Sequence, residues 1–196
     1  MLTDPPPRTA SLQEKFLASD RLGTLKVPPD DRLRQAANAI ESAMQSGGAV
    51  PVRQACAAFL SVASDFYKVR PPLIRILAAR PLRVREAGMA IELFGDYHPG
   101  TLVIRLWMRT AIRKQVTSFG TFLSTLCHEF CHHLDCQQLG FPDSWHTRGF
   151  YERTAMLYHH ARGSPMKRLV WVRTSGKRWR IDWPRTNRGG NHLVIG

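Results

Sequence analysis

The sequence predicts an α+β fold with N-terminal helices, a small antiparallel sheet, two further helices and a C-terminal β-hairpin. Apolar residues recur at helical spacing in four long segments, and short segments with the pattern of strands lie between and after them. With 196 residues the chain is long enough to bury a core. It divides into a flexible tail at 1–30, a helical segment at 31–69, a core at 70–165 and a basic hairpin and tail at 166–196.

The first third of the chain is predicted to hold two helices behind the flexible tail. Residues 1–30 contain two proline clusters, a composition that favours a loose chain with at most a short helix at 12–18. Residues 31–46 have helical spacing, and a glycine pair at 47–48 stops the helix. A second helix is predicted at 52–69, where two prolines then break it.

The middle of the chain is predicted to form the sheet. Strand patterns occur at 73–77, 90–94 and 101–108, with a turn at 98–100 between the last two. Short strands joined by such turns favour antiparallel pairing.

The segment 117–138 is a predicted amphipathic helix that contains an H-E-x-x-H motif. At about 100° per residue, its aromatic and leucine side chains form one stripe, and His128 and His132 fall on the opposite face. Two imidazoles so placed can reach one metal ion. Glu129 is then beside the ion's open position, where a carboxylate can accept a proton from water. The segment is therefore predicted to be the metal-binding helix of a zinc hydrolase, with two solvated histidines as the alternative.

A catalytic zinc ion usually has three protein ligands and one open position, so a third ligand is needed. His146 is the leading candidate, in the first turn of a second helix predicted at 144–161 with Asp143 or Ser144 as its cap. Glu152 competes, because its distance along the chain from the motif is close to that in zinc peptidases whose third ligand is a glutamate.

The H-E-x-x-H motif, the thirteen-residue gap before His146, and Phe150 four residues later resemble the SprT-like (Spartan-type) zinc metallopeptidase domain. The resemblance covers residues 70–165. It implies a peptidase that acts on a protein or peptide, with one zinc ion and with Glu129 as general base. It implies zinc ligands at His128, His132 and His146.

Peptide hydrolysis also needs a donor to the oxyanion that develops when water attacks the scissile carbonyl. The second helix offers several polar side chains, and the sequence does not choose among them. The candidates are Arg148, Tyr151, Arg153 and Tyr158.

The strand at 101–108 carries a further hypothesis. As an edge strand beside the metal-binding helix, residues 102–107 would pair with an extended substrate, since backbone pairing gives affinity with little reading of sequence. A fully paired interior strand is the alternative.

The C-terminal segment 169–183 has the pattern of a β-hairpin with a glycine-containing turn. Alternation places Trp179, Ile181 and Trp183 on one face. In one interpretation the tryptophans pack on the core, and 184–196 is a tail. In the other, the hairpin binds nucleic acid through base stacking and phosphate contacts. The candidate contacts are Arg173, Lys177, Arg178 and Arg180.

The net charge of +13 is uneven: residues 70–115 carry +6 and residues 167–196 carry +7, whereas residues 116–166 carry −1. Basic flanks of this kind suit DNA or another polyanion, although a solvated basic surface has the same composition. Two functions stay open. One is a zinc endopeptidase that acts on DNA-associated proteins, and the other is a nucleic-acid-binding module with a structural or non-catalytic metal site.

The sequence has no stretch of about 18 apolar residues, and its first residues lack the basic-then-apolar pattern of a signal peptide. We therefore expect a cytoplasmic protein without a membrane partner.

Overall fold

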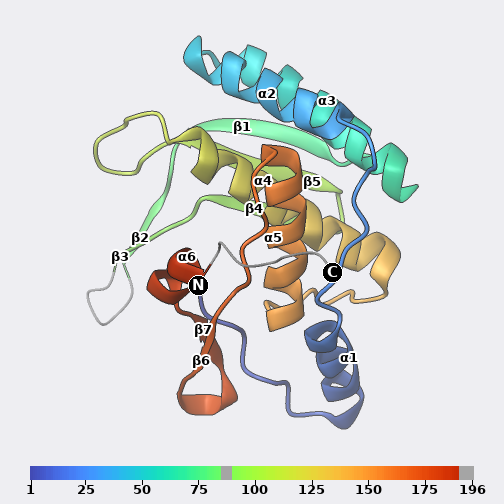
Figure 1. Ribbon diagram of the computed structural model, residues 1–196. Helices are drawn as coiled ribbons and strands as arrows, with labels where there is room; N and C mark the ends of the chain where they lie inside the picture. The colour runs from blue at the N-terminus through green and yellow to red at the C-terminus, as the bar shows by residue number, and fades with distance from the viewer. Residues whose placement is uncertain (85–89, 190–196) are drawn as a thin grey trace.

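The computed structural model describes residues 1–84 and 90–189, and it has the α+β fold that the sequence predicts (Figure 1). The described helices are α1 (Ala10–Arg21), α2 (Arg32–Gln45), α3 (Ala49–Tyr67), α4 (Phe119–Leu134), α5 (Arg148–Arg162) and α6 (Trp183–Gly189). The strands are β1 (Leu73–Ala79), β2 (Leu82–Val84), β3 (Ala90–Glu92), β4 (Gly95–His98), β5 (Val103–Arg109), β6 (Trp171–Arg173) and β7 (Trp179–Ile181).

Helices α2 and α3 confirm the two helices predicted before the sheet, and they pack on each other (Figure 1). α3 begins at Ala49, three residues earlier than predicted, with Pro51 in its first turn. Proline fits there because the first N–H groups of a helix have no partner within the helix. The helix ends at Tyr67, and Lys68 takes the left-handed conformation that closes many helices.

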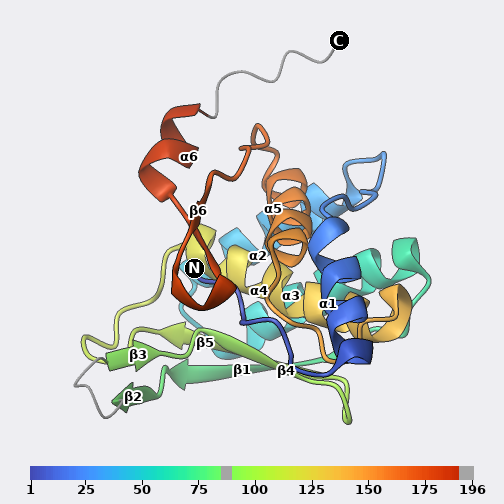
Figure 2. The same ribbon diagram turned by 90° about the horizontal axis from the view of Figure 1, so that it is seen from below.

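The main sheet is mixed, so the prediction of an antiparallel sheet is wrong. β5 lies in the centre, with β1 parallel on one side and β4 antiparallel on the other. The chain reverses between β2 and β3 and again between β4 and β5, so it enters β5 in the direction of β1. Figure 2 shows this sheet along one side of the molecule, with the β6–β7 hairpin and α6 apart from it.

Strand assignments in the sheet also differ from the prediction. β3 pairs with β2 in a separate two-stranded ribbon, and the unpredicted β4 is the strand that forms a hairpin with β5. Ile104 and Leu106 of β5 are fully buried. The hypothesis that residues 102–107 form a substrate-binding edge is therefore wrong, and the interior alternative is confirmed. Both β4 and β5 pack beside α4.

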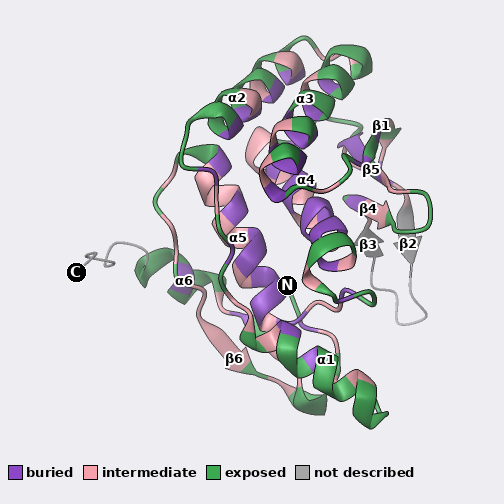
Figure 3. Cartoon of the chain, turned by 90° about the vertical axis from the view of Figure 1, so that its right-hand side faces the viewer, coloured by how far each residue is buried: buried purple, intermediate pink, exposed green. Residues whose placement is uncertain are grey.

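Helix α4 runs through the centre of the molecule with most of its residues buried (Figure 3). Ser118 caps it by accepting a hydrogen bond from the backbone N–H of Thr121. The apolar stripe packs against α5, β4, β5 and α2. The helix continues into one π-helical segment, Asp135–Leu139, and Gly140 with a φ of 76° ends it, close to the predicted end at residue 138.

The helix predicted at 144–161 starts later than expected. α5 begins at Arg148, and Thr147 caps it by accepting from the N–H of Phe150. His146 therefore lies in the loop before the helix and not in its first turn. Ser144 is not a cap but has a φ of 41°, and its hydroxyl contacts His132 of α4.

Residues 1–30 pack on the core, contrary to the predicted flexible tail. α1 has twelve residues, more than the predicted short helix, and it contacts α5. Asp20 pairs with Arg148, and Ser19 hydrogen bonds Thr147. A side chain at Gly149 would collide with α1, since its Cβ would lie 2.2 Å from the Ser19 carbonyl oxygen. The contacts that order this segment lie far away in the sequence, so its local composition did not reveal them.

Candidate metal centre

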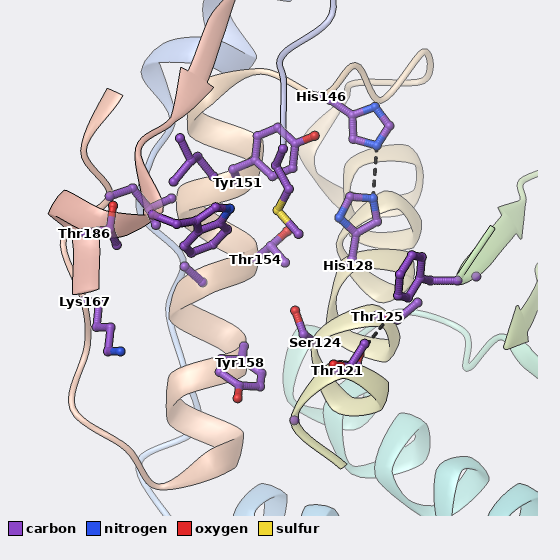
Figure 4. A pocket seen from close by; sticks show the side chains of 18 of the residues that line it. Thr121, Ser124, Thr125, His128, His146, Tyr151, Thr154, Tyr158, Lys167 and Thr186 are labelled. Carbon is purple, nitrogen blue, oxygen red and sulfur yellow. Dashed lines mark hydrogen bonds between the residues drawn. The ribbon is translucent and has the colours of Figure 1, made fainter. Parts of the chain in front are cut away.

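Three histidine side chains meet beside a cleft. Nε2 of His128 lies 3.0 Å from Nε2 of His146 and 3.2 Å from Nε2 of His132, and those two are 3.2 Å apart. Nitrogens bound tetrahedrally to one zinc ion lie about 3.3 Å apart. Among the described residues, these three histidines are the one group of His, Cys, Asp or Glu side chains that is close enough to bind a metal ion. Figure 4 shows the rings of His128 and His146 facing each other, joined by a dashed line.

Phe150 forms a common platform for the three imidazoles. It is fully buried, and its ring centroid lies 4.9 Å from that of His128, 4.4 Å from that of His132 and 5.2 Å from that of His146. Its position at the start of α5 brings the loop histidine to the two on α4. The spacing between His146 and Phe150 thus has a packing reason.

A chain of hydrogen bonds fixes the ring of His132. Its Nδ1 lies 2.7 Å from Oγ of Ser144, which donates at 3.0 Å to the buried carboxylate of Asp135. Asp135 in turn accepts from Arg153 at 2.8 Å. A proton held on Nδ1 leaves Nε2 free for a metal ion, which is the usual role of such outer partners.

Asp4 has the same role for His146, and sequence reasoning missed it. One carboxylate oxygen of Asp4 lies 2.9 Å from the backbone N and 3.3 Å from Nδ1 of His146. Burial acts to raise the pKa of Asp4, but the hydrogen bonds from His146 outweigh it and leave the pKa below its usual value. No local pattern in the sequence connects the two residues, which lie 142 positions apart.

Replacement of Asp4 by alanine should weaken metal binding by about 10- to 100-fold, since it removes the carboxylate that orients His146. Competition with a chromophoric chelator measures the affinity. Asp30→Ala is the matched control, because Asp30 is an exposed carboxylate that pairs with Arg32. Equal affinities for the two variants would show that Asp4 does not support the site.

The two helix histidines are poised to bind a metal ion as neutral imidazoles. Burial, and then the charge of His146, lower the pKa of His128 to about 3. Burial also lowers the pKa of His132 well below its ordinary value. A metal ion binds the neutral form, so no proton has to be displaced from these two rings near pH 7.

Glu129 lies on the wall of the same cleft, one residue after the first histidine. Only 5% of it is exposed. Burial, and then the charge of Asp96, raise the pKa of its carboxyl to about 8. A divalent cation at the histidines would favour the ionised carboxylate and oppose this shift. β4 packs tightly here because Gly95 has no side chain: a Cβ would lie 2.7 Å from Thr125 and 3.0 Å from Cγ of Glu129.

The structure separates the competing ligand from the site. Glu152 accepts a hydrogen bond at 3.1 Å from the indole N–H of Trp171 in the hairpin, and it is not in the histidine group. The structure therefore does not support Glu152 as the third metal ligand. His146 is the residue that lies beside the two helix histidines.

Of the four candidate oxyanion donors, two form ion pairs with other residues. Arg148 forms an ion pair with Asp20, and the buried Arg153 pairs with Asp135. Tyr151 lies next to the metal centre, with its ring centroid 5.7 Å from that of His146. Tyr158 lines the same cleft farther along α5, as Figure 4 shows.

The cleft has a volume of about 1070 Å³ and is lined mostly by apolar atoms. Its walls come from α4, α5, the segment around β4 and the C-terminal hairpin (Figure 4). Small residues on α4 keep it open below His128, and they include Gly120, Thr121, Ser124 and Thr125. The face of α4 that carries His128, opposite the apolar stripe, is thus one wall of this cleft.

The predicted C-terminal hairpin is present as β6 and β7, and Trp171 and Trp179 contact the protein. Trp183, predicted on the same face as Trp179, instead begins α6 and is 41% exposed. The indole of Trp171 donates to Glu152, and the guanidinium of Arg148 lies 4.6 Å from the ring centroid of Trp179. Arg178 is partly buried and donates to the Thr3 carbonyl at 2.7 Å. Of the predicted nucleic-acid contacts, the side chains left exposed are Arg173, Lys177 and Arg180. The predicted tail after the hairpin begins as α6, and residues 190–196 lie outside the described part.

Within residues 1–84 and 90–189, no helix combines the length and apolar character needed to cross a membrane. Comparison of the chain with models of protein families, with curated proteins and with solved structures finds no match. A function for the chain therefore has to be argued from the residues of the site.

Proposed function

We propose that this protein is a zinc-dependent endopeptidase. The observation that carries the proposal is the group of three Nε2 atoms within 3.2 Å of one another, with Glu129 next to His128 on the wall of the cleft. The SprT-like resemblance of the motif supports the same function.

The donor set favours zinc in a catalytic role. Within residues 1–84 and 90–189, three imidazole nitrogens come together without a fourth protein ligand, which matches the ligand count of catalytic zinc sites that keep one position for water. Imidazole also suits copper, nickel and iron, so the choice of zinc belongs to the proposal.

A zinc ion held by His128, His132 and His146 would supply an activated water molecule near neutral pH. Glu129 would accept a proton from this water as the water oxygen attacks the scissile carbonyl carbon, and would then give the proton to the leaving amine. Tyr151 is the proposed donor to the oxyanion. Burial keeps the pKa of Tyr151 above its usual value, so its hydroxyl retains the proton that it donates.

The shape of the cleft favours a polypeptide substrate. A cavity of about 1070 Å³ is large enough for several residues, and its mostly apolar lining suits apolar side chains. The exposed cations Arg173, Lys177 and Arg180 favour a polyanion such as DNA as a second partner, which would bring the enzyme to DNA-associated proteins.

The same exposed cations favour the second candidate function, a nucleic-acid-binding module whose metal site does not catalyse. The engagement of Trp171 and Trp179 by the protein argues against the stacking part of that function. Tight, salt-sensitive DNA binding by a chain that carries no metal would favour the module over the peptidase.

Zinc content tests the proposed site. The purified chain should contain one zinc ion, and His146→Ala should lose most of it, because two imidazoles remain. Elemental analysis by mass spectrometry measures the content. His98→Ala is the matched control, since His98 is exposed at the end of β4, beside Thr101. An unchanged zinc content in His146→Ala would remove His146 from the site.

Activity is tested with a fluorescently labelled, unfolded protein as substrate. The parent chain should cleave it, a chelator should stop the cleavage, and added zinc should restore it. A zinc-loaded chain that leaves both this protein and a peptide library intact would contradict the proposed function.

A further inference from the structure

Residues 1–3 lie along β7 as if they were a third strand of the C-terminal hairpin. The N–H of Thr3 donates to the Trp179 carbonyl at 2.8 Å, and the N–H of Ile181 donates to the Met1 carbonyl at 3.2 Å. Leu2 forms an antiparallel bridge with Arg180. Figures 1 and 2 both show the N-terminus beside the hairpin. β6 pairs with the other side of β7, so this segment covers the outer edge of the hairpin.

The same segment runs through the cleft to the metal centre. Met1 and Leu2 line the cleft together with His128 and Glu129. The hydroxyl of Tyr151 donates to the Leu2 carbonyl at 3.2 Å. The backbone thus runs extended beside the site, with one of its carbonyl oxygens held by the proposed oxyanion donor.

We propose that the outer edge of β7 is a peptide-binding edge, which takes an extended polypeptide segment by antiparallel backbone pairing, and that residues 1–3 occupy it in competition with substrate. The substrate role rests on the proposed peptidase function. The edge offers the backbone groups of Trp179 and Ile181, which the chain's own segment now uses.

The surroundings of the edge select apolar side chains. Met1 and Leu2 are partly exposed within the cleft, where the neighbouring lining includes Phe94, Leu169 and Trp183. A substrate that followed the same path would place apolar side chains in these positions. Most of its hydrogen bonds would come from the backbone, so the edge would accept many sequences.

Competition by residues 1–3 is an intramolecular effect. A tethered segment acts at an effective concentration of about a millimolar, so it lowers the apparent affinity for a free peptide. Asp4 must be kept in any test, because it supports His146. Thr3→Pro meets this requirement: it removes the N–H that donates to Trp179 and the hydroxyl that accepts from the Trp179 N–H at 2.8 Å.

The test is a titration of acetyl-Met-Leu-Thr-amide into isotope-labelled protein, followed by the amide NMR signals of Trp179 and Ile181. Both proteins carry Glu129→Gln, so that no probe is cleaved. Binding to the Thr3→Pro variant should be at least about tenfold tighter than binding to the protein that keeps Thr3, because the tethered competitor is weakened. If Thr3→Pro does not fold, Thr3→Val loses only the hydroxyl and should show a smaller gain.

A peptide N-methylated at its threonine is the matched ligand control, since it keeps the side chains but cannot donate to the Trp179 carbonyl. It should bind at least about tenfold more weakly, in line with the loss of a backbone hydrogen bond. Equal affinities for the two peptides, or signals that move on Gly95 and Tyr97 of β4 instead, would overturn the inference.

The two proposals fail separately. A chain that cleaves protein with zinc while the probe leaves Trp179 and Ile181 unmoved contradicts the peptide-binding edge alone. A chain that binds the probe at β7 yet holds no metal and cleaves nothing supports the edge and contradicts the peptidase.

Discussion

Glu129→Gln should lower the rate of peptide hydrolysis by on the order of 10²- to 10⁴-fold, the range that a general base contributes. The glutamine side chain has nearly the same size, but its amide cannot accept the proton from water. Zinc content should stay that of the parent, because Glu129 is not in the ligand group. Initial rates on the labelled unfolded protein, with zinc measured in the same samples, give both quantities.

Glu14→Gln is the matched control for this substitution. Glu14 is exposed on α1, outside the cleft, so its replacement should leave both rate and zinc content as they are. A Glu129→Gln variant that hydrolyses at the parental rate would show that another group accepts the proton.

Arg153→Met should lower the free energy of unfolding by about 3–5 kcal/mol, the usual cost of removing one partner of a buried ion pair. Arg153 and Asp135 pair at 2.8 Å with side chains only 1% and 0% exposed. Arg153 also donates to the carbonyl oxygens of Ser19 and Leu22, and so connects α5 to α1. Urea unfolding followed by circular dichroism measures the loss.

The cost of Arg153→Met should grow with pH. Burial raises the pKa of Asp135 to about 6 even with Arg153 beside it. Because this pKa lies above that of the unfolded chain, the protonated carboxyl favours folding, and that contribution is lost as pH rises through about 6. Without the arginine the pKa rises further, so the variant should lose less stability at pH 5 than at pH 8.

Two further variants serve as controls for the predicted effect of Arg153→Met. Arg34→Met removes an exposed partner of Asp31 and should change stability by less than about 1 kcal/mol. Arg153→Met combined with Asp135→Leu should recover part of the loss, since no lone charge stays buried. A single variant as stable as the parent at pH 8 would show that the ion pair does not hold the helices together.

Local patterns in the sequence predicted the helices well. The helical spacing of residues in 117–138 predicted that both histidines lie opposite the apolar stripe, and α4 has that arrangement. Helical spacing also predicted α2 and α3, with errors of a few residues at their ends. These features depend on residues three or four positions apart, which a sequence displays directly.

The relative directions of the strands and their order in the sheet could not be predicted from local patterns. β1 and β5 are joined by a long connection that holds three short strands, and each reversal in it changes which pairings are possible. A strand pattern shows which residues can pair but not their partner. β4 is only four residues long and includes Gly95 and Asp96, so it lacks the pattern of a strand.

The chemical groups that this protein can offer are visible in its sequence: an H-E-x-x-H helix, a further histidine at a suitable distance, and a basic hairpin. Which of these groups meet depends on how the chain folds. It brought His146 rather than Glu152 to the helix histidines and placed Asp4 behind His146. It also laid residues 1–3 along β7 in the cleft. The contacts of Asp4 and of residues 1–3 join positions more than a hundred residues apart, which no local pattern displays. His146 is only 14 and 18 positions from the helix histidines, but the packing of Phe150 against all three rings brings it to them.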